Sequence, residues 1–403
     1  MRIIRKLKSR PLLRGLIPLF VLAHLSHHLL TALPTPLLPF IRDDFGLSYA
    51  QSGLVVLAFS LAYGIGQVPA GMITDRVGPR LMITIGICGV AIVGFLVGFS
   101  QSFIMLLAFL AVMGLVGASY HPAAAPLITH SVKPEHLGRL LGIHLMGGSG
   151  SFFLAPLIAA AVAPVWGWRG AFISLAVPTM IFGIIFYPLL GRCLNRGEAT
   201  RGATGQSVEE TVPSGGRMRS FVAFMVLSVF SQAVLISSIS FIPLYMVDHF
   251  GVTEGIAAVF LAAIYSAGLW ASPLGGYLAD RFGTVRVVLT MSFVTSLVMC
   301  LLTIIPYGPN GIFIGALLLF TGAILYIRMP AAEAYIMHNS PEHRRSTMLG
   351  IYYFANMETG AVFTPLMGSL IDRFNFQTSF TVAGVTALVV TVGCWMFLKG
   401  NRD

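Results

Sequence analysis

Charged side chains are scarce in this 403-residue chain, where Asp, Glu, Lys and Arg together make up only 10% of the residues. Soluble globular domains carry roughly 25% charged residues. So few charges cannot cover a surface that faces water on all sides. The mean hydropathy of +0.84 also indicates a predominantly apolar chain. The scarcity therefore excludes an ordinary soluble protein and indicates that lipid covers much of the surface.

Cysteine and nucleotide-binding motifs are also scarce or missing. The four cysteines, Cys88, Cys193, Cys300 and Cys394, lie far apart in the sequence. This spacing indicates neither a disulfide framework nor a cysteine metal site. No glycine-rich loop of the GxxxxGK[ST] kind occurs, which argues against ATP as an energy source.

Long apolar runs are what the chain has instead. A helix that crosses a bilayer needs about 20 apolar residues, and open sheet edges are excluded in lipid. The sequence therefore predicts an all-α polytopic membrane protein with twelve transmembrane helices. The expected spans are 16–40, 50–73, 80–99, 103–129, 139–163, 169–190, 220–246, 253–278, 285–306, 311–337, 346–370 and 377–398.

The polar segments between the runs predict the organisation of the chain. The longest, 191–219, is rich in Arg, Glu, Gly, Ser and Thr, and is expected to be a flexible cytoplasmic linker. It would join an N-terminal six-helix bundle (1–190) to a C-terminal one (220–403). Most of the 25 Lys and Arg residues fall on the side of this linker, so we expect both termini in the cytoplasm. The same distribution explains the net charge of +10 without a nucleic-acid partner.

The two expected bundles repeat each other at an offset of roughly 205–209 residues. The segment GMITDRVGPR (71–80) corresponds to GYLADRFGTVR (276–286). Further pairs in the same order are 122–124 with 330–332, 134–136 with 341–343, and 141–143 with 349–351. Repeats of this kind are typical of transporters that hold the solute between their halves near the middle of the membrane.

The segment 71–80 resembles the best-known motif of the major facilitator superfamily, and its repeat at 276–286 strengthens the resemblance. The segment GWRGAF (167–172) is also similar to that family. Within it, the segments 120–122 and 142–148 most resemble the fosmidomycin-resistance and drug-efflux branch. The resemblance covers essentially the whole chain. It implies two pseudo-two-fold related six-helix bundles that move a small solute across the inner membrane.

The charged residues of the repeated motif are candidates for a gate on the cytoplasmic side. The resemblance implies that they make polar contacts in one state and release them in the other. An alternative is that they only anchor the loops and set orientation. The candidates are Asp75, Arg76, Arg80, Asp280, Arg281, Arg286 and, near the cytoplasmic end of its helix, Glu333.

Two ionisable residues lie inside apolar runs, where an exposed charge would be very unfavourable. Glu358 lies about halfway along 346–370, so it should face a cavity or Arg328. It could carry a proton or bind solute, or form a static ion pair with Arg328. Arg328, within 311–337, could hold an anionic solute or only neutralise Glu358.

Histidines form the third group of candidates: His24, His27, His28, His121 and His144. His24 and His28 are four residues apart and share one helix face, a spacing that can bind a metal. No carboxylate or cysteine accompanies them in the first expected helix, so we predict no metal site. Hydrogen bonding to solute or a proton relay is favoured, with plain helix packing as the alternative for one or two of the three.

These observations predict a secondary active transporter, proton-coupled and exporting small amphipathic compounds, that acts as a monomer without a cofactor. The alternative is uptake or exchange of an organic anion held by Arg328 and histidines. A membrane enzyme is not favoured, because no local cluster of nucleophile, base or metal residues occurs in the sequence.

Overall fold

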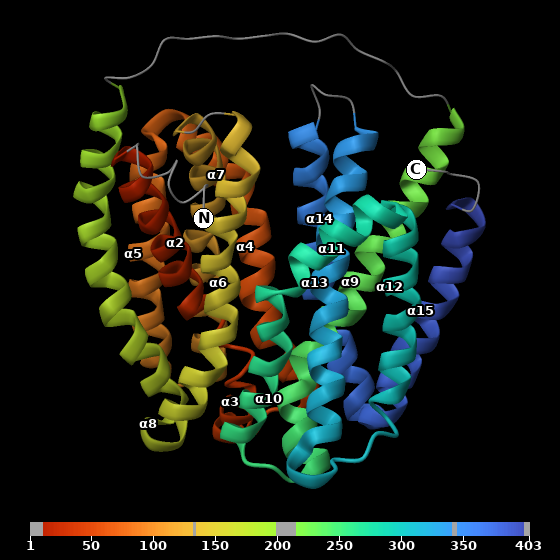
Figure 1. Ribbon diagram of the computed structural model, residues 1–403. Helices are drawn as coiled ribbons and strands as arrows, with labels where there is room; N and C mark the ends of the chain where they lie inside the picture. The colour runs from red at the N-terminus through yellow and green to blue at the C-terminus, as the bar shows by residue number, and fades with distance from the viewer. Residues whose placement is uncertain (1–10, 132–133, 199–214, 341–344, 399–403) are drawn as a thin grey trace. The chain divides into compact units, whose positions relative to one another are not determined.

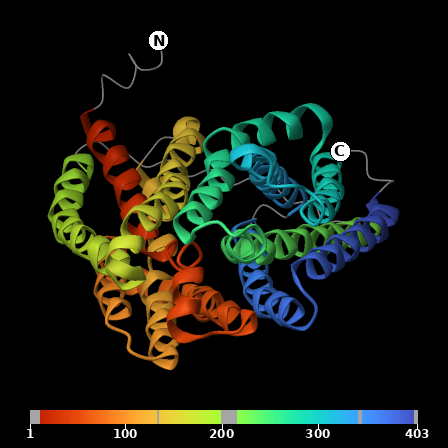
Figure 2. The same ribbon diagram turned by 90° about the horizontal axis from the view of Figure 1, so that it is seen from below.

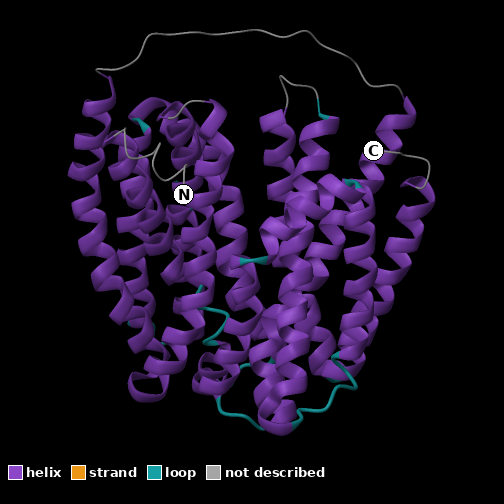
Figure 3. Ribbon diagram, in the orientation of Figure 1, coloured by secondary structure: helices purple, strands orange, loops and turns teal. Residues whose placement is uncertain are grey.

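The computed structural model describes residues 11–131, 134–198, 215–340 and 345–398, and these are helices and the loops between them, with no strand (Figures 1 and 3). The expected all-α class is confirmed. The α-helices are α2 (Pro11–Thr31), α3 (Leu38–Phe45), α4 (Tyr49–Val77), α5 (Pro79–Gly98), α6 (Phe103–Gly117), α7 (Tyr120–Ser131), α8 (Pro134–Glu198), α9 (Gly215–Phe250), α10 (Glu254–Ser266), α11 (Ala271–Phe282), α12 (Thr284–Leu301), α13 (Ile312–Asn339), α14 (Arg345–Arg373) and α15 (Phe376–Leu398).

Within the described residues, eight helices are long and apolar enough to cross a bilayer, or nine if a helix pair bent by 45° counts as one span. One of the eight, the stretch 146–193 of α8, contains the predicted span 169–190 and most of the predicted span 139–163. Gly167 divides it with a non-helical backbone at φ 68° and ψ 171°. Glycine has no Cβ and adopts this conformation at little cost, so the chain turns where the sequence predicted a break between spans.

The chain forms two compact units. Unit 1 consists of residues 1–40 and 58–206, and unit 2 of residues 41–57 and 207–403. This division resembles the predicted one except that the segment 41–57 belongs with the C-terminal residues. The ends of the predicted linker are helical, because α8 continues to Glu198 and α9 begins at Gly215. Its middle, 199–214, lies outside the described residues.

In unit 1, α2 packs against α8 and α5, and α5 packs in turn against α6 and α7 (Figure 2). A buried cluster joins these helices through Phe20 of α2, Ile83 of α5, Tyr120 of α7 and Phe186 of α8. The predicted histidines of α2 therefore face helices that carry other candidates, not lipid.

In unit 2, α9 lies beside α14 and α15, and α13 packs against α10, α11 and α12 (Figure 2). Two glycines allow the backbones to approach α13 closely. A methyl group on Gly275 of α11 would lie 2.3 Å from the carbonyl oxygen of Ile327, and one on Gly322 of α13 would lie 2.0 Å from that of Ile264. Small residues at such contacts are typical of packed membrane helices. The close contacts at Gly275 and Gly322 hold α13, which carries Arg328, against α10 and α11.

Candidate functional site

Three of the predicted histidines come together inside unit 1. One nitrogen from each of His24 and His28 on α2 and His121 on α7 lies within 4.8 Å of the other two. The closest pair is the Nε2 atoms of His28 and His121, which are 3.1 Å apart. All three were predicted as candidates, but a metal-binding spacing was considered only for His24 and His28 of α2.

A break in the fourth predicted span positions His121. The span divides into α6 and α7 at Ala118 and Ser119. Pro122, the third residue of α7, has no N–H with which to continue the hydrogen bonds of α6. The Ser119 hydroxyl at this break lies 2.8 Å from the carbonyl oxygen of Val116 and 3.1 Å from that of Met82 on α5. A methyl group on Gly86 of α5 would lie 2.9 Å from that hydroxyl, so this glycine is needed for the approach.

Two glycines of α8 make room for His24. A methyl group on Gly147 would lie 2.3 Å from the carbonyl oxygen of Val21, and one on Gly148 would lie 2.7 Å from the His24 ring. The rings of His24 and His144 stack with centroids 4.2 Å apart. His24 Nδ1 lies 2.9 Å from the backbone carbonyl of His144. The N–H can only be on Nδ1 for this contact, which leaves the Nε2 of His24 without a proton when the ring is neutral.

The fifth histidine, His27, lies behind this cluster. It is fully buried, and its ring stacks on that of Tyr120 with centroids 4.6 Å apart. Among the described residues, neither of its ring nitrogens makes a hydrogen bond of normal length, and the buried hydroxyl of Tyr63 makes none either. All five predicted histidines therefore belong to one aromatic and polar cluster of unit 1.

Arg328 is fully buried in unit 2. One guanidinium NH₂ group donates to the carbonyl of Ser228 at 2.6 Å and to its hydroxyl at 3.1 Å. The other donates to the side-chain oxygen of Gln232. The Ser228 hydroxyl also lies 2.8 Å from that of Tyr352 on α14. These partners are neutral, and the Nε of Arg328 has no partner among the described residues.

Glu358 lies on α14 in the same unit. Both its carboxylate oxygens are buried and have no hydrogen-bond partner among the described residues. The ion pair with Arg328 that the sequence analysis considered is not formed between these two described side chains. The unit thus holds a guanidinium and a carboxyl group that do not pair with each other among the described residues.

The predicted gating residues have varied surroundings. Glu333 accepts a hydrogen bond from the Tyr353 hydroxyl. Arg80 donates to the carbonyl of Tyr187 at 2.9 Å and lies over its ring at 3.8 Å. Arg281 donates to the Tyr277 hydroxyl at 2.8 Å.

The remaining gating candidates are exposed or not described. Arg76, Asp280 and Arg286 are exposed. Asp75 belongs to α4, but its side chain lies outside what the structure describes. A gating role for these residues stays a prediction.

A polar cluster that the sequence analysis missed lies in unit 2. Arg42 of α3 forms a two-pronged ion pair with Asp248 of α9, and the Tyr49 hydroxyl donates to the same carboxylate at 2.6 Å. Burial is the largest single influence and lowers the pKa of Arg42, but the hydrogen bonds and negative charges of Asp248 and Asp43 together raise that pKa above its ordinary value. The two residues are 206 positions apart in the sequence, so no local pattern indicates that they pair.

The beginning of α4 is held in the same cluster. The backbone N–H groups of Tyr49 and Ala50 each donate to one carboxylate oxygen of Asp372, both at 2.8 Å. A helix N-terminus has unpaired N–H groups and a partial positive charge, which a carboxylate satisfies. Asp372 of α14 therefore caps α4.

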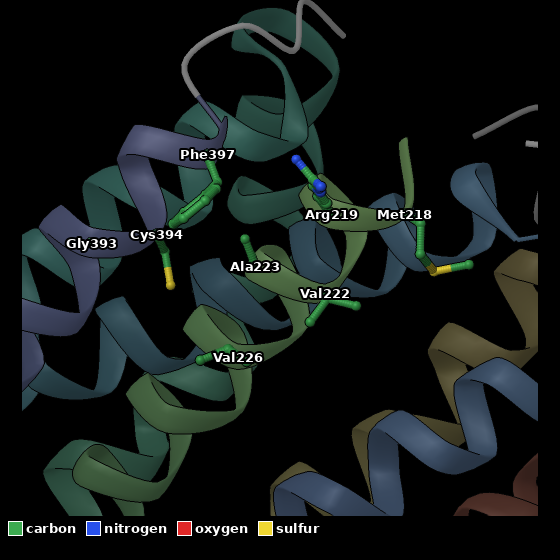
Figure 4. A pocket seen from close by; sticks show the side chains of 8 residues that line it. All are labelled: Met218, Arg219, Val222, Ala223, Val226, Gly393, Cys394 and Phe397. Carbon is green, nitrogen blue, oxygen red and sulfur yellow. The ribbon is translucent and has the colours of Figure 1, made fainter. Parts of the chain in front are cut away.

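A hollow of about 420 Å³ lies between α9 and α15 (Figure 4). It contains none of the candidate residues, and its lining is apolar apart from Arg219 at its edge. The lining residues are Met218, Arg219, Val222, Ala223, Val226, Gly393, Cys394 and Phe397. We do not place the functional site there.

Comparison with known families gives a match over nearly the whole chain. The model of the Major Facilitator Superfamily matches residues 20–269 and 221–403. The multidrug resistance protein MdtG of Escherichia coli O17:K52:H18 is 25% identical over 382 residues, which cover 92% of this chain and 91% of that protein. A probable L-galactonate transporter of Escherichia coli K12 is 33% identical over 149 residues, 37% of this chain and only 33% of that protein.

Solved structures of transporters share the fold. A bacterial homologue of the human lysosomal transporter Spinster, in an inward-facing and occupied conformation, has a TM-score of 0.74 and 19% identity, covering 97% of this chain and 96% of that one. A POT family transporter in complex with 5-aminolevulinic acid has a TM-score of 0.79 and 14% identity, with 96% of each chain covered. At these identities the likeness establishes the fold alone.

Proposed function

Because the chain belongs to the Major Facilitator Superfamily, we propose that it is a proton-coupled exporter of small amphipathic compounds that works by alternating access. The superfamily and its relatives are multi-pass membrane transporters, not enzymes. We further propose the inner membrane as its location, with both termini in the cytoplasm, since most Lys and Arg residues lie in loops of one side.

The proposal of proton coupling rests on the buried, unpaired carboxyl group of Glu358. Its carboxylate is buried within α14 without a hydrogen-bond partner among the described residues. An ionised carboxylate in such a place is costly, so the group is expected to hold a proton while it is enclosed. It would lose the proton when a conformational change brings water or a cation to it. A carboxyl group that alternates in this way couples proton movement to solute movement.

The relatives support export. MdtG, which is named as a multidrug resistance protein, matches over nine tenths of both chains. Multidrug resistance implies transport of varied apolar or amphipathic compounds. The aromatic and polar clusters of each unit offer the mixture of ring and hydrogen-bonding surfaces that such solutes need.

The experiment is transport into proteoliposomes, with fluorescent amphipathic dyes and antibacterial compounds as probes, with and without a pH gradient. The parent protein should concentrate at least one probe only when the gradient is present. Glu358→Gln, which keeps the shape of the side chain, should lose gradient-driven accumulation.

The matched control is Glu254→Gln, the same chemical change in the first turn of α10. It should accumulate the probe like the parent protein. Uphill accumulation that survives in Glu358→Gln would contradict the role of this carboxyl group. Accumulation that needs no pH gradient in the parent would contradict proton coupling itself.

Arg328 supports a second candidate, the exchange or uptake of an organic anion. It is a fully buried cation whose described partners are a serine, a glutamine and a carbonyl, and its Nε donor is unused. A carboxylate on the solute would satisfy both the charge and the free donor.

The two candidates make different predictions for solute choice. If the protein transports organic anions, small carboxylic acids should compete with the transported probe. Arg328→Met should then abolish that competition. If only neutral or cationic amphipathic compounds compete, in the parent and in Arg328→Met alike, the organic-anion hypothesis is wrong.

A further inference from the structure

We propose that His24, His28 and His121 form a binding site for a divalent transition-metal ion of the zinc class. Neither the family match nor the relatives' names assign such a site. The sequence alone argued against it, because α2 offers only two imidazoles on one face. The fold adds a third from α7, and the three ligand nitrogens lie within 4.8 Å of one another.

The spacing of the closest pair fits a shared metal ion. Two nitrogens that are bound to one tetrahedral Zn²⁺ at about 2.05 Å each lie about 3.3 Å apart. The Nε2 atoms of His28 and His121 are 3.1 Å apart. A direct hydrogen bond between the two imidazoles has the same separation, so a metal-binding measurement must distinguish the two arrangements.

The surroundings of His28 leave its Nε2 ready to bind a metal. Its Nδ1 lies 3.1 Å from the Thr31 hydroxyl oxygen, and that hydroxyl donates its own hydrogen to the His28 carbonyl at 3.4 Å. The hydroxyl oxygen must then accept the Nδ1–H of His28. The Nε2 therefore carries a lone pair, which points towards the Nε2 of His121.

His24 also has a hydrogen-bonded Nδ1–H and a free lone pair on Nε2. Its Nδ1 donates to the backbone carbonyl of His144 at 2.9 Å, so the lone pair is on Nε2. An imidazole that donates from one nitrogen to a carbonyl or hydroxyl while the other faces a shared point is the usual arrangement around a bound metal. His24 and Thr31 are both buried, so these orienting contacts are protected from water.

The ligand set selects the class of ion. The group contains no carboxylate, so Ca²⁺ and Mg²⁺, which prefer oxygen ligands, are not expected. Imidazole suits Zn²⁺, Ni²⁺, Co²⁺ and Cu²⁺. Three protein ligands leave a fourth position for water or an anion.

A bound ion would join α2 to α7 within unit 1. The proposal does not rest on the coupling role of Glu358, which lies in unit 2. Glu358→Gln should therefore bind the metal like the parent protein, and failure of either proposal can be recognised separately.

The test is metal binding by the full-length protein, purified in detergent with a tag that contains no histidine and stripped with a chelator. Isothermal titration should give one Zn²⁺ per chain, and Co²⁺ should give the intense visible absorption of a four-coordinate ion. His28→Ala and His121→Ala should each weaken Zn²⁺ binding at least about tenfold. Thr31→Val should weaken it about tenfold by releasing the orientation of His28.

Two variants guard against loss of folding and nonspecific binding. His121→Cys replaces one metal ligand by another, so it should still bind Co²⁺ and add a sulfur-to-cobalt absorption band. His249→Ala removes a histidine of unit 2 that lies 3.0 Å from Gln377, and should leave binding unchanged. Absence of binding to the folded parent protein would overturn the proposal. Equal binding by His28→Ala, His121→Ala and the parent would overturn it as well.

Discussion

The two units bury different kinds of polar side chain. Unit 1 gathers five histidines among tyrosines, groups that can all be neutral, and holds them by ring stacking and backbone carbonyls. Unit 2 encloses a guanidinium and a carboxyl group that do not pair with each other. Neutral imidazoles can stay enclosed at modest cost, whereas an unpaired charge in a membrane helix is costly and calls for a ligand or a proton.

This difference in buried polar groups indicates that the two units have different roles, although their sequences repeat each other. His121 and Arg328 fall within one residue of each other when the repeats are aligned at Pro122 and Pro330. One position became part of a histidine cluster and the other a buried cation. Corresponding turns of the two repeats therefore carry different chemistry, a histidine at 121 in one and an arginine at 328 in the other.

The largest effect is expected at Glu358. Glu358→Gln should reduce gradient-driven accumulation to the level of protein-free liposomes, because the amide cannot release a proton. Exchange of labelled for unlabelled solute at equal concentrations should persist, since that process needs no net proton movement. A variant that loses both activities would show that Glu358 serves binding or folding instead of coupling.

Arg328→Lys should have the next largest effect. Lysine keeps the charge but loses the planar fork that reaches Ser228 and Gln232. A hydrogen bond to a charged group contributes about 1.5–3 kcal/mol, so the affinity for an anionic solute should fall roughly ten- to a hundredfold. Competition binding measures this effect. Unchanged affinity would remove Arg328 from the solute site.

Gly147→Ala tests the packing of unit 1. The added methyl group would lie 2.3 Å from the Val21 carbonyl oxygen, so α8 must move away from α2. Overpacking of this kind typically costs about 1–3 kcal/mol, which should lower the thermal unfolding temperature of the purified protein. Gly150→Ala is the control on the same helix, because its nearest neighbour, Leu25 Cδ1, would lie 3.6 Å away. Equal stability of the two variants would contradict the described contact.

Asp372→Asn should have the smallest effect. The side chain keeps its shape but loses the charge that faces the N–H groups of Tyr49 and Ala50. Charge at a helix N-terminus contributes about 0.3–1 kcal/mol, so only a small fall in unfolding temperature is expected. Asp43→Asn, which alters an exposed pair with Arg42, should change stability less. The reverse order would contradict the capping role of Asp372.

Much of the fold follows from the sequence because lipid permits few alternatives. Apolar runs of about 20 residues must be helices, and Gly167, between two such runs, marks a turn that the structure contains. The boundaries of the linker were less predictable. Polar composition between 191 and 198 suggested a flexible chain, but helical hydrogen bonding continues from the preceding apolar turns through Glu198.

The candidate site was predictable in part. Rarity alone singled out Arg328, Glu358 and the histidines, since ionisable groups in apolar runs are costly. Their partners were not predictable, because Asp248 meets Arg42 across 206 residues and His121 meets His28 across 93. Contacts over such separations depend on how helices pack, which periodicity in one segment does not determine.

The most direct test of proton coupling is proton release on solute binding in weakly buffered detergent solution, recorded with a pH indicator dye. The solute is the one that the liposome transport experiment identifies. We expect the parent protein to release about one proton for each solute bound near neutral pH, and Glu358→Gln to bind the solute without releasing any. Equal proton release by the parent and by Glu358→Gln would contradict this expectation.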